Sequence, residues 1–368
     1  MGRIASEEML KESLVYRGDT YKVKKVFEKA DRGEDITVAF IGGSITQGCN
    51  ATIHENCYAN RTYLWFKNRF PKINVTYLNA GIGATGSIIG VHRVENQVLS
   101  KNPDIVFVDF AVNDKDNKYN KIAYDSLIRR ILTHNSKPAV VEVFMSTDIL
   151  GNVQEQQIEI GKRYNVPMVS FRDAIRTEIS NGNLKWNEVA SDEVHPNDKG
   201  HKIISELLIN LLESIDRDDD IKGNEDKIIG QPVFGEDYIK GQILNSDSVE
   251  VICTKGMVVD TEGFQGFKNG WTIDSDFSSE GNLKLEVEGK NIFVLYKKLI
   301  KDTAGSFDVK INGNYIKNIN SYFEGGWGDY SETEVLIEGD KKERYTIEFL
   351  VDSNNIYKEI YIMGLLVS

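Results

Sequence analysis

The sequence predicts an α/β domain with a parallel sheet covered by helices on both faces, followed by a C-terminal antiparallel β-sandwich domain. Up to about residue 215, short and mostly continuous apolar runs alternate with helical patterns. Such runs are typical of parallel strands that are buried on both faces. From about residue 233, short β-rich runs are separated by turn residues at a spacing of roughly ten residues, which is typical of a sandwich.

Strands and helices can be assigned in order along the first domain, which we expect to span residues 1–215. A helix ends this domain, because Ile203, Leu207 and Leu211 recur there at helical spacing. The expected strands cover residues 37–41, 73–78, 104–110, 139–144 and 166–169. The expected helices cover residues 58–70, 87–99, 124–132, 154–164 and 199–215.

An acidic stretch separates this domain from the β-rich region. Residues 216–232 contain Asp218, Asp219 and Asp220 and have no periodic apolar pattern, so we expect a linker. The second domain, residues 233–368, contains the turn signals Glu288-Gly289-Lys290 and Asn312-Gly313-Asn314. Its expected strands cover residues 283–287, 291–296, 307–311, 333–337 and 345–350.

Composition argues against several classes of partner. The 368 residues include 44 basic and 56 acidic side chains, and the net charge of −12 repels nucleic acid and anionic membrane surfaces. No apolar run approaches the length of a membrane span, and the N-terminus has no apolar signal core. Cys49, Cys57 and Cys253 form neither a disulfide framework nor a Cys-x-x-Cys metal pair. We therefore expect a cytoplasmic protein without a nucleic-acid or membrane partner; the oligomeric state is left open.

Two polar motifs could supply a nucleophile and its base. Ser44 follows Gly42 and Gly43 directly after the first strand, so its hydroxyl lies at the edge of the sheet where α/β proteins bind ligands. His195 precedes the last helix, and Asp192 lies three residues before it. A histidine can take a serine proton if a carboxylate holds the imidazole in one tautomer. Taken alone, each motif is more simply an ordinary turn or a surface loop.

Two further turns could supply hydrogen-bond donors for an oxyanion. Asn113 follows the third strand, and its side-chain amide can donate to a developing negative charge. A glycine-rich turn at residues 79–87 follows the second strand and can present backbone N–H groups to an anion. Separately, both are also common turn sequences.

Together, the four segments resemble the four blocks of the SGNH (GDSL-type) hydrolase superfamily over residues 35–215. Gly-Gly-Ser-Ile replaces the usual Gly-Asp-Ser-Leu around Ser44, and the usual glycine of the second block falls on Ala84, with Gly83 as an alternative. The resemblance implies a flavodoxin-like sheet and no metal or organic cofactor. It also implies a catalytic triad of Ser44, Asp192 and His195, and an oxyanion hole of the Ser44 N–H, the Ala84 N–H and the Asn113 amide.

Within this superfamily, the Gly-Gly-Ser-Ile-Thr-Gln-Gly sequence and the β-rich C-terminal region resemble carbohydrate O-acetylesterases that carry a carbohydrate-binding-module-like domain. The resemblance implies a serine esterase that removes O-acetyl groups from acetylated plant oligosaccharides, with mannan favoured and xylan possible. Two alternatives stay open. One is a lipase, lysophospholipase or thioesterase that acts on longer acyl chains, and the other is a catalytically inactive sugar-binding protein.

One aromatic loop of the second domain is a candidate for substrate binding. Residues 322–330 contain four aromatic side chains among glycines, including Trp327. A Trp ring can cover the apolar face of a sugar, so we expect Trp327 to bind substrate near Ser44 as a lid. The alternative is that the ring packs into the core of its own domain.

Overall fold

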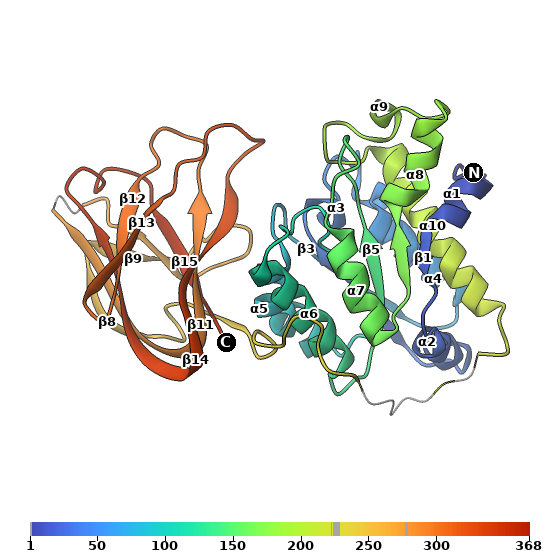
Figure 1. Cartoon of the computed structure of the whole chain (residues 1–368), viewed down its shortest axis with the longest axis horizontal. Helices are drawn as coiled ribbons and strands as arrows, with labels where there is room; N and C mark the ends of the chain where they lie inside the picture. The colour runs from blue at the N-terminus through green and yellow to red at the C-terminus, as the bar shows by residue number, and fades with distance from the viewer. Residues whose placement is uncertain (1, 222, 224–228, 277–278) are drawn as a thin grey trace. The chain divides into compact units, whose positions relative to one another are not determined.

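The computed structural model describes residues 2–221, 223, 229–276 and 279–368. The chain folds into two compact units, Met1–Ile239 and Lys240–Ser368, which are coloured blue to yellow and yellow to red in Figure 1. The first unit thus continues past the expected linker, because Phe234 N–H donates to Asp125 Oδ2 at 2.7 Å and Tyr238 N–H donates to Ser126 Oγ at 3.3 Å. Residues 222 and 224–228 of that linker lie outside the described residues.

The first unit is built on a six-stranded sheet with the order β1-β6-β5-β4-β2-β3. The five strands β2 to β6 are parallel, as the sequence predicts, and β1 pairs antiparallel with β6 at one edge. Strand β1 was not predicted, because it is only three residues long and none of its side chains is fully buried. The strands are β1 Leu14–Tyr16, β2 Ile36–Gly42, β3 Val75–Gly81, β4 Ile105–Asp109, β5 Ala139–Phe144 and β6 Met168–Ser170.

Helices cover both faces of this sheet (Figure 1). One core contains Phe27 of α2, Phe66 of α4 and Leu208 of α10 together with Phe40 of β2, and α5, α6 and α7 lie on the opposite face. The helices are α1 Glu7–Glu12, α2 Tyr21–Asp31, α3 Ser44–Gln47, α4 Tyr58–Arg69, α5 Ser87–Gln97, α6 Lys118–Leu132, α7 Gln154–Tyr164, α8 Phe171–Ser180, α9 Trp186–Val189 and α10 Asp198–Asp216, with 3-10 turns at His54–Asn56 and Leu99–Lys101. None of the described helices has the length and apolar character needed to cross a bilayer.

All strand pairs of the second unit are antiparallel across the described ranges, apart from two isolated parallel bridges, which confirms the predicted β class for this part of the chain. Two long strands, β11 and β14, pair along almost their whole length, from Gly281 opposite Val351 to Lys298 opposite Tyr330. The strands are β7 Gln242–Leu244, β8 Glu250–Lys255, β9 Met257–Asp260, β10 Gly270–Ile273, β11 Gly281–Lys298, β12 Ser306–Ile311, β13 Asn314–Asn320, β14 Tyr330–Val351 and β15 Tyr361–Val367.

Strand β11 joins two of the predicted strands, so the expected turn at Glu288-Gly289-Lys290 is wrong. The register with β14 shifts between Gly289 and Asn291, which makes this position a β-bulge within one strand. Before the bulge the core residues are odd-numbered, as at Leu285, and after it they are even-numbered, as at Val294. The bulge therefore lets a single strand face the same core on both of its halves.

Candidate active site

The glycines before Ser44 allow the ends of two strands to approach each other closely. Strand β2 ends at Gly42, Gly43 caps α3, and Ser44 is the first residue of that helix. A Cβ atom on Gly43 would overlap Asn113 Oδ1, and one on Gly42 would overlap Thr46 Oγ1. The pair of glycines thus brings Asn113, from the loop after β4, directly beside the backbone that carries Ser44.

Ser44, His195 and Asp192 form one continuous hydrogen-bonded line. Ser44 Oγ lies 2.9 Å from His195 Nε2, and His195 Nδ1 lies 2.9 Å from Asp192 Oδ2 and 3.0 Å from Oδ1. The His195 side chain is almost fully buried, and Ser44 is half-buried. This arrangement matches the geometry that a serine nucleophile, a base and an orienting carboxylate require.

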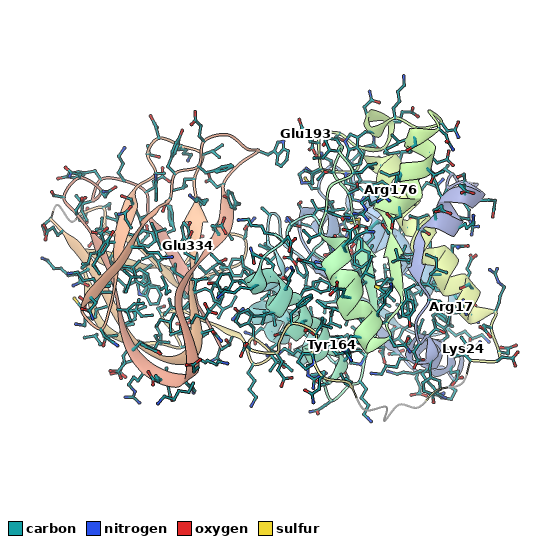
Figure 2. All side chains as sticks on the ribbon, in the orientation of Figure 1. Arg17, Lys24, Tyr164, Arg176, Glu193 and Glu334 are labelled. Carbon is teal, nitrogen blue, oxygen red and sulfur yellow. The ribbon has the colours of Figure 1, made fainter. Side chains whose placement is uncertain are left out.

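The three-residue spacing works because the loop before α10 folds back as a tight turn. Asp192 Oδ1 accepts hydrogen bonds from Val194 N–H at 2.8 Å and from His195 N–H at 2.7 Å. Ser191 N–H donates to the His195 carbonyl at 2.9 Å, which closes the turn. Figure 2 labels Glu193, the exposed residue inside this turn.

The electrostatics of the pair favour a charged Asp192 and a basic His195. Burial alone raises the pKa of Asp192, but the N–H groups of His195 and Val194 and the imidazole outweigh it and hold the pKa below its usual range. Burial lowers the pKa of His195, but hydrogen bonds with the Cys49 and Asp192 side chains outweigh that effect and raise it above its usual value. His195 is therefore well suited to accept a proton near neutral pH.

Asn50, which no sequence pattern indicated, also contacts the triad. Its Nδ2 donates to Asp192 Oδ2 at 2.9 Å, and its backbone adopts a left-handed φ of 63°. The neighbouring Cys49 carbonyl accepts a hydrogen bond from His201 Nε2 at 3.0 Å, which fixes the loop to α10. No local motif signals this role, because Asn50 and Asp192 are 142 residues apart.

The described structure distinguishes between the two candidate donors in the loop after β3. Gly83 N–H donates to Gln47 Oε1 at 2.9 Å, so this group is already engaged. Ala84 is exposed, has a left-handed φ of 57°, and its N–H donates to no acceptor in the described ranges. Ser44 N–H, at the start of α3, and Asn113 Nδ2 likewise have no acceptor among the described residues. These three are the donor groups that the sequence resemblance assigns to an oxyanion hole.

Buried polar side chains fasten the segments that carry these donors. Asp114 accepts hydrogen bonds from Ser87 N–H at 2.7 Å, Asn120 Nδ2 at 3.0 Å and Gln157 Nε2 at 3.1 Å, and burial raises the pKa of this carboxyl to about 7. Arg93 donates to the Gly42 carbonyl at 3.0 Å and to the Ala80 carbonyl at 2.6 Å. Because Gly42 and Ala80 lie at the ends of β2 and β3, Arg93 ties together the two strands that precede Ser44 and Ala84.

Other features of the chain lie outside this site. A cavity of about 530 Å³ lies at the other end of the strands, where β5 begins, and its lining includes Ala139, Tyr164 and Pro167. Figure 2 places Tyr164 and Glu193 at opposite ends of the first unit. Across the described ranges, no cluster of three His, Cys, Asp or Glu side chains is suited to hold a metal ion.

Trp327 lies in the second unit, in the segment between β13 and β14, and its side chain is 68% exposed. The alternative expectation that its ring packs into the core of its own unit is therefore wrong. Trp271, on β10, is the tryptophan that enters this core, with 1% of its surface exposed.

Comparisons with known proteins relate the chain to ester hydrolases. The model of the GDSL-like lipase/acylhydrolase family matches residues 40–203. A crystal structure described as a two-domain esterase (CEX) active on acetylated mannans is similar along the whole chain, with 32% identity, a TM-score of 0.91 and 98% of each chain covered. The same esterase co-crystallised with mannopentaose gives 31% identity and a TM-score of 0.90, covering 98% of this chain and 97% of that chain. No curated protein sequence matches the chain.

Proposed function

Because the chain belongs to the GDSL-like lipase/acylhydrolase family of carboxylic ester hydrolases, we propose that it removes O-acetyl groups from acetylated oligosaccharides. Acetylated mannan is the favoured substrate, since the similar two-domain esterase is described as active on acetylated mannans. Acetylated xylan is the second substrate class. The observation that carries this proposal is the hydrogen-bonded line from Ser44 Oγ through His195 to Asp192.

The first half of the reaction forms an acetyl-enzyme. His195 Nε2 accepts the proton of Ser44 Oγ, and Oγ attacks the carbonyl carbon of the acetyl ester. The carbonyl oxygen becomes an oxyanion, which the N–H groups of Ser44 and Ala84 and the Asn113 amide stabilise. Asp192 stabilises the imidazolium, since its pKa is held low and it stays charged. The bond between the carbonyl carbon and the sugar oxygen then breaks, and His195 donates the proton it took from Ser44 to that sugar oxygen.

The second half releases acetate. A water molecule gives a proton to His195 Nε2 and attacks the acetyl carbon that is bound to Ser44 Oγ. The same three donors stabilise the second oxyanion. The bond between Oγ and the carbon breaks, Oγ takes the proton from His195, and acetic acid leaves and ionises to acetate in solution. The chain's own residues perform every proton transfer in this sequence.

The exposed ring of Trp327 supports a sugar-binding role for its loop. Aromatic rings stack on the apolar faces of sugars, and an indole with 68% of its surface exposed offers a large area for this contact. In this proposal Trp327 contacts the oligosaccharide and leaves the chemistry to the first unit.

The proposal is tested by mass spectrometry of acetylated mannan and xylan oligosaccharides before and after incubation with the protein. We expect loss of acetyl groups and release of acetate, and we expect Ser44→Ala to abolish both. Nitrophenyl esters of increasing chain length form the second arm, with activity highest on acetate. Preference for long chains would favour a lipase or thioesterase, and unchanged deacetylation by Ser44→Ala would refute the catalytic role of this serine.

A further inference from the structure

Gln47 connects the helix of the nucleophile to the loop that carries Ala84. It is the last residue of α3, its side chain is exposed, and its Oε1 accepts the N–H of Gly83 at 2.9 Å. At the same helix end, Asn79 Nδ2 donates to the Thr46 carbonyl at 2.8 Å. The end of α3 is thus hydrogen-bonded both to β3 and to the loop that follows it.

In the loop after β3, Ala84 adopts a backbone conformation that is unfavourable for alanine. Ala84 has a φ of 57°, in the left-handed region where glycine is favoured. Such a residue keeps this conformation only when the surrounding contacts fix it, and strained residues of this kind gather at functional sites. Here the contacts are Gly83 N–H to Gln47, Ile82 N–H to the Gly42 carbonyl at 3.1 Å, and Thr85 Oγ–H to the Ile82 carbonyl at 2.8 Å.

The hydrogen bond from Gly83 also selects which N–H group remains available. Two adjacent N–H groups, those of Gly83 and Ala84, could serve an oxyanion in this loop. Because Gly83 N–H donates to Gln47, only the Ala84 N–H keeps its donor capacity toward a ligand within the described hydrogen bonds.

We propose that Gln47 is a positioning residue for the oxyanion hole, which holds the Ala84 N–H toward the reacting carbonyl. This inference rests on the proposed esterase function. Without the Gln47 acceptor, the loop loses the hydrogen bond that holds the Ile82–Gly83 peptide, which directly precedes the peptide carrying the Ala84 N–H. It then relaxes from the left-handed conformation, and the donor spends less time in place when negative charge develops on the carbonyl oxygen.

A simpler role for an exposed glutamine beside Ser44 is direct binding of the sugar. The two roles differ in their dependence on substrate. A positioning role lowers kcat on every ester, including a small nitrophenyl acetate, because each passes through the same oxyanion. A sugar-binding role raises KM on oligosaccharides and leaves nitrophenyl acetate unaffected.

The test compares Gln47→Ala and Gln47→Met with the wild type on nitrophenyl acetate and on an acetylated mannan oligosaccharide. Gln47→Met keeps the length of the side chain but removes the acceptor oxygen. We expect kcat to fall roughly 10- to 100-fold on both substrates with KM nearly unchanged, which is less than the 10²- to 10³-fold loss typical of deleting a whole oxyanion donor. Gln242→Ala, at an exposed glutamine of β7, is the matched control.

Amide hydrogen exchange of the segment around Gly83 reports the hydrogen bond independently of activity. We expect faster exchange in Gln47→Ala and Gln47→Met. Gln47→Glu keeps an acceptor oxygen, so we expect it to retain the exchange protection and to have a higher kcat than the other two variants. Unchanged kcat, a loss confined to oligosaccharides, or unchanged exchange would each overturn the inference. Ser44→Ala is assayed in parallel: if it stays active, the proposed function has failed, and if it is inactive while the Gln47 variants match the wild type, only the role of Gln47 has failed.

Discussion

Substituting Gly43 by alanine tests whether the Asn113 amide takes part in catalysis, without replacing Asn113 itself. The φ of Gly43 is −89°, a value open to alanine, so the effect comes from the added methyl group and not from backbone strain. That methyl would overlap Asn113 Oδ1 and lie 2.9 Å from Asn113 Cγ and 3.3 Å from Nδ2. The whole amide must therefore move away from the backbone of Ser44.

The expected cost follows from the group that is displaced. Loss of one oxyanion donor typically costs about 2.7–4 kcal/mol, or 10²- to 10³-fold in kcat. We expect Gly43→Ala to lose most of that amount, with little change in KM on nitrophenyl acetate. Gly230→Ala is the matched control in the same unit, since its added Cβ would lie at an ordinary contact distance of 3.5 Å from Arg163 Cδ.

A double-mutant cycle with Asn113→Ala isolates the mechanism. In the Asn113→Ala background the side-chain amide is gone, so the methyl group at residue 43 no longer overlaps it. We expect the double variant to be about as active as Asn113→Ala alone, because the two changes remove the same donor. Wild-type activity in Gly43→Ala, or losses that multiply in the double variant, would refute this reasoning.

Three further outcomes are expected. Because the pKa of His195 is raised and activity needs its neutral form, we expect kcat/KM to fall with decreasing pH, with a midpoint above the ordinary histidine pKa of 6.5. Asp192→Asn should move this midpoint to lower pH, and a flat profile from pH 5 to 8 contradicts the assignment. Asn50→Gly, which keeps the left-handed backbone but removes the hydrogen bond to Asp192, lowers kcat about fivefold, equivalent to about 1 kcal/mol, and full activity would show the bond to be dispensable. Trp327→Ala lowers kcat/KM on acetylated oligosaccharides and spares nitrophenyl acetate, whereas no loss on either substrate rules out sugar binding by this ring.

Much of the first unit could be predicted because its determinants are local. The strands β2, β4, β5 and β6 are buried on both faces, so each appears as a short apolar run. The polar residues that follow parallel strands share one edge of the sheet. Ser44, Asn113, Asp192 and His195 could therefore be proposed from their positions along the chain. Helix α2 was overlooked although Val23, Val26, Phe27 and Ala30 have helical spacing.

The features that could not be predicted depend on contacts between distant segments. Asn50 reaches Asp192 across 142 residues, and Gln47 reaches Gly83 across 36. Whether Gly83 or Ala84 offers its N–H depends on the orientation of one peptide, which no residue pattern encodes. The turn assigned at Gly289 was wrong for a related reason, since glycine favours a turn and a bulge alike, and only the pairing of β11 with β14 distinguishes the two.

The continuous pairing of β11 with β14 also has a consequence for how the second unit folds. The pair nearest in sequence is Lys298 with Tyr330, and the most distant is Gly281 with Val351. Closing a longer loop costs more chain entropy, so we expect the ladder to form first at the Lys298 end and to extend toward Gly281. Both halves of these strands contribute to one hydrophobic core, so neither half can keep its share of that core when the other separates. We therefore expect the second unit to unfold as a single cooperative body.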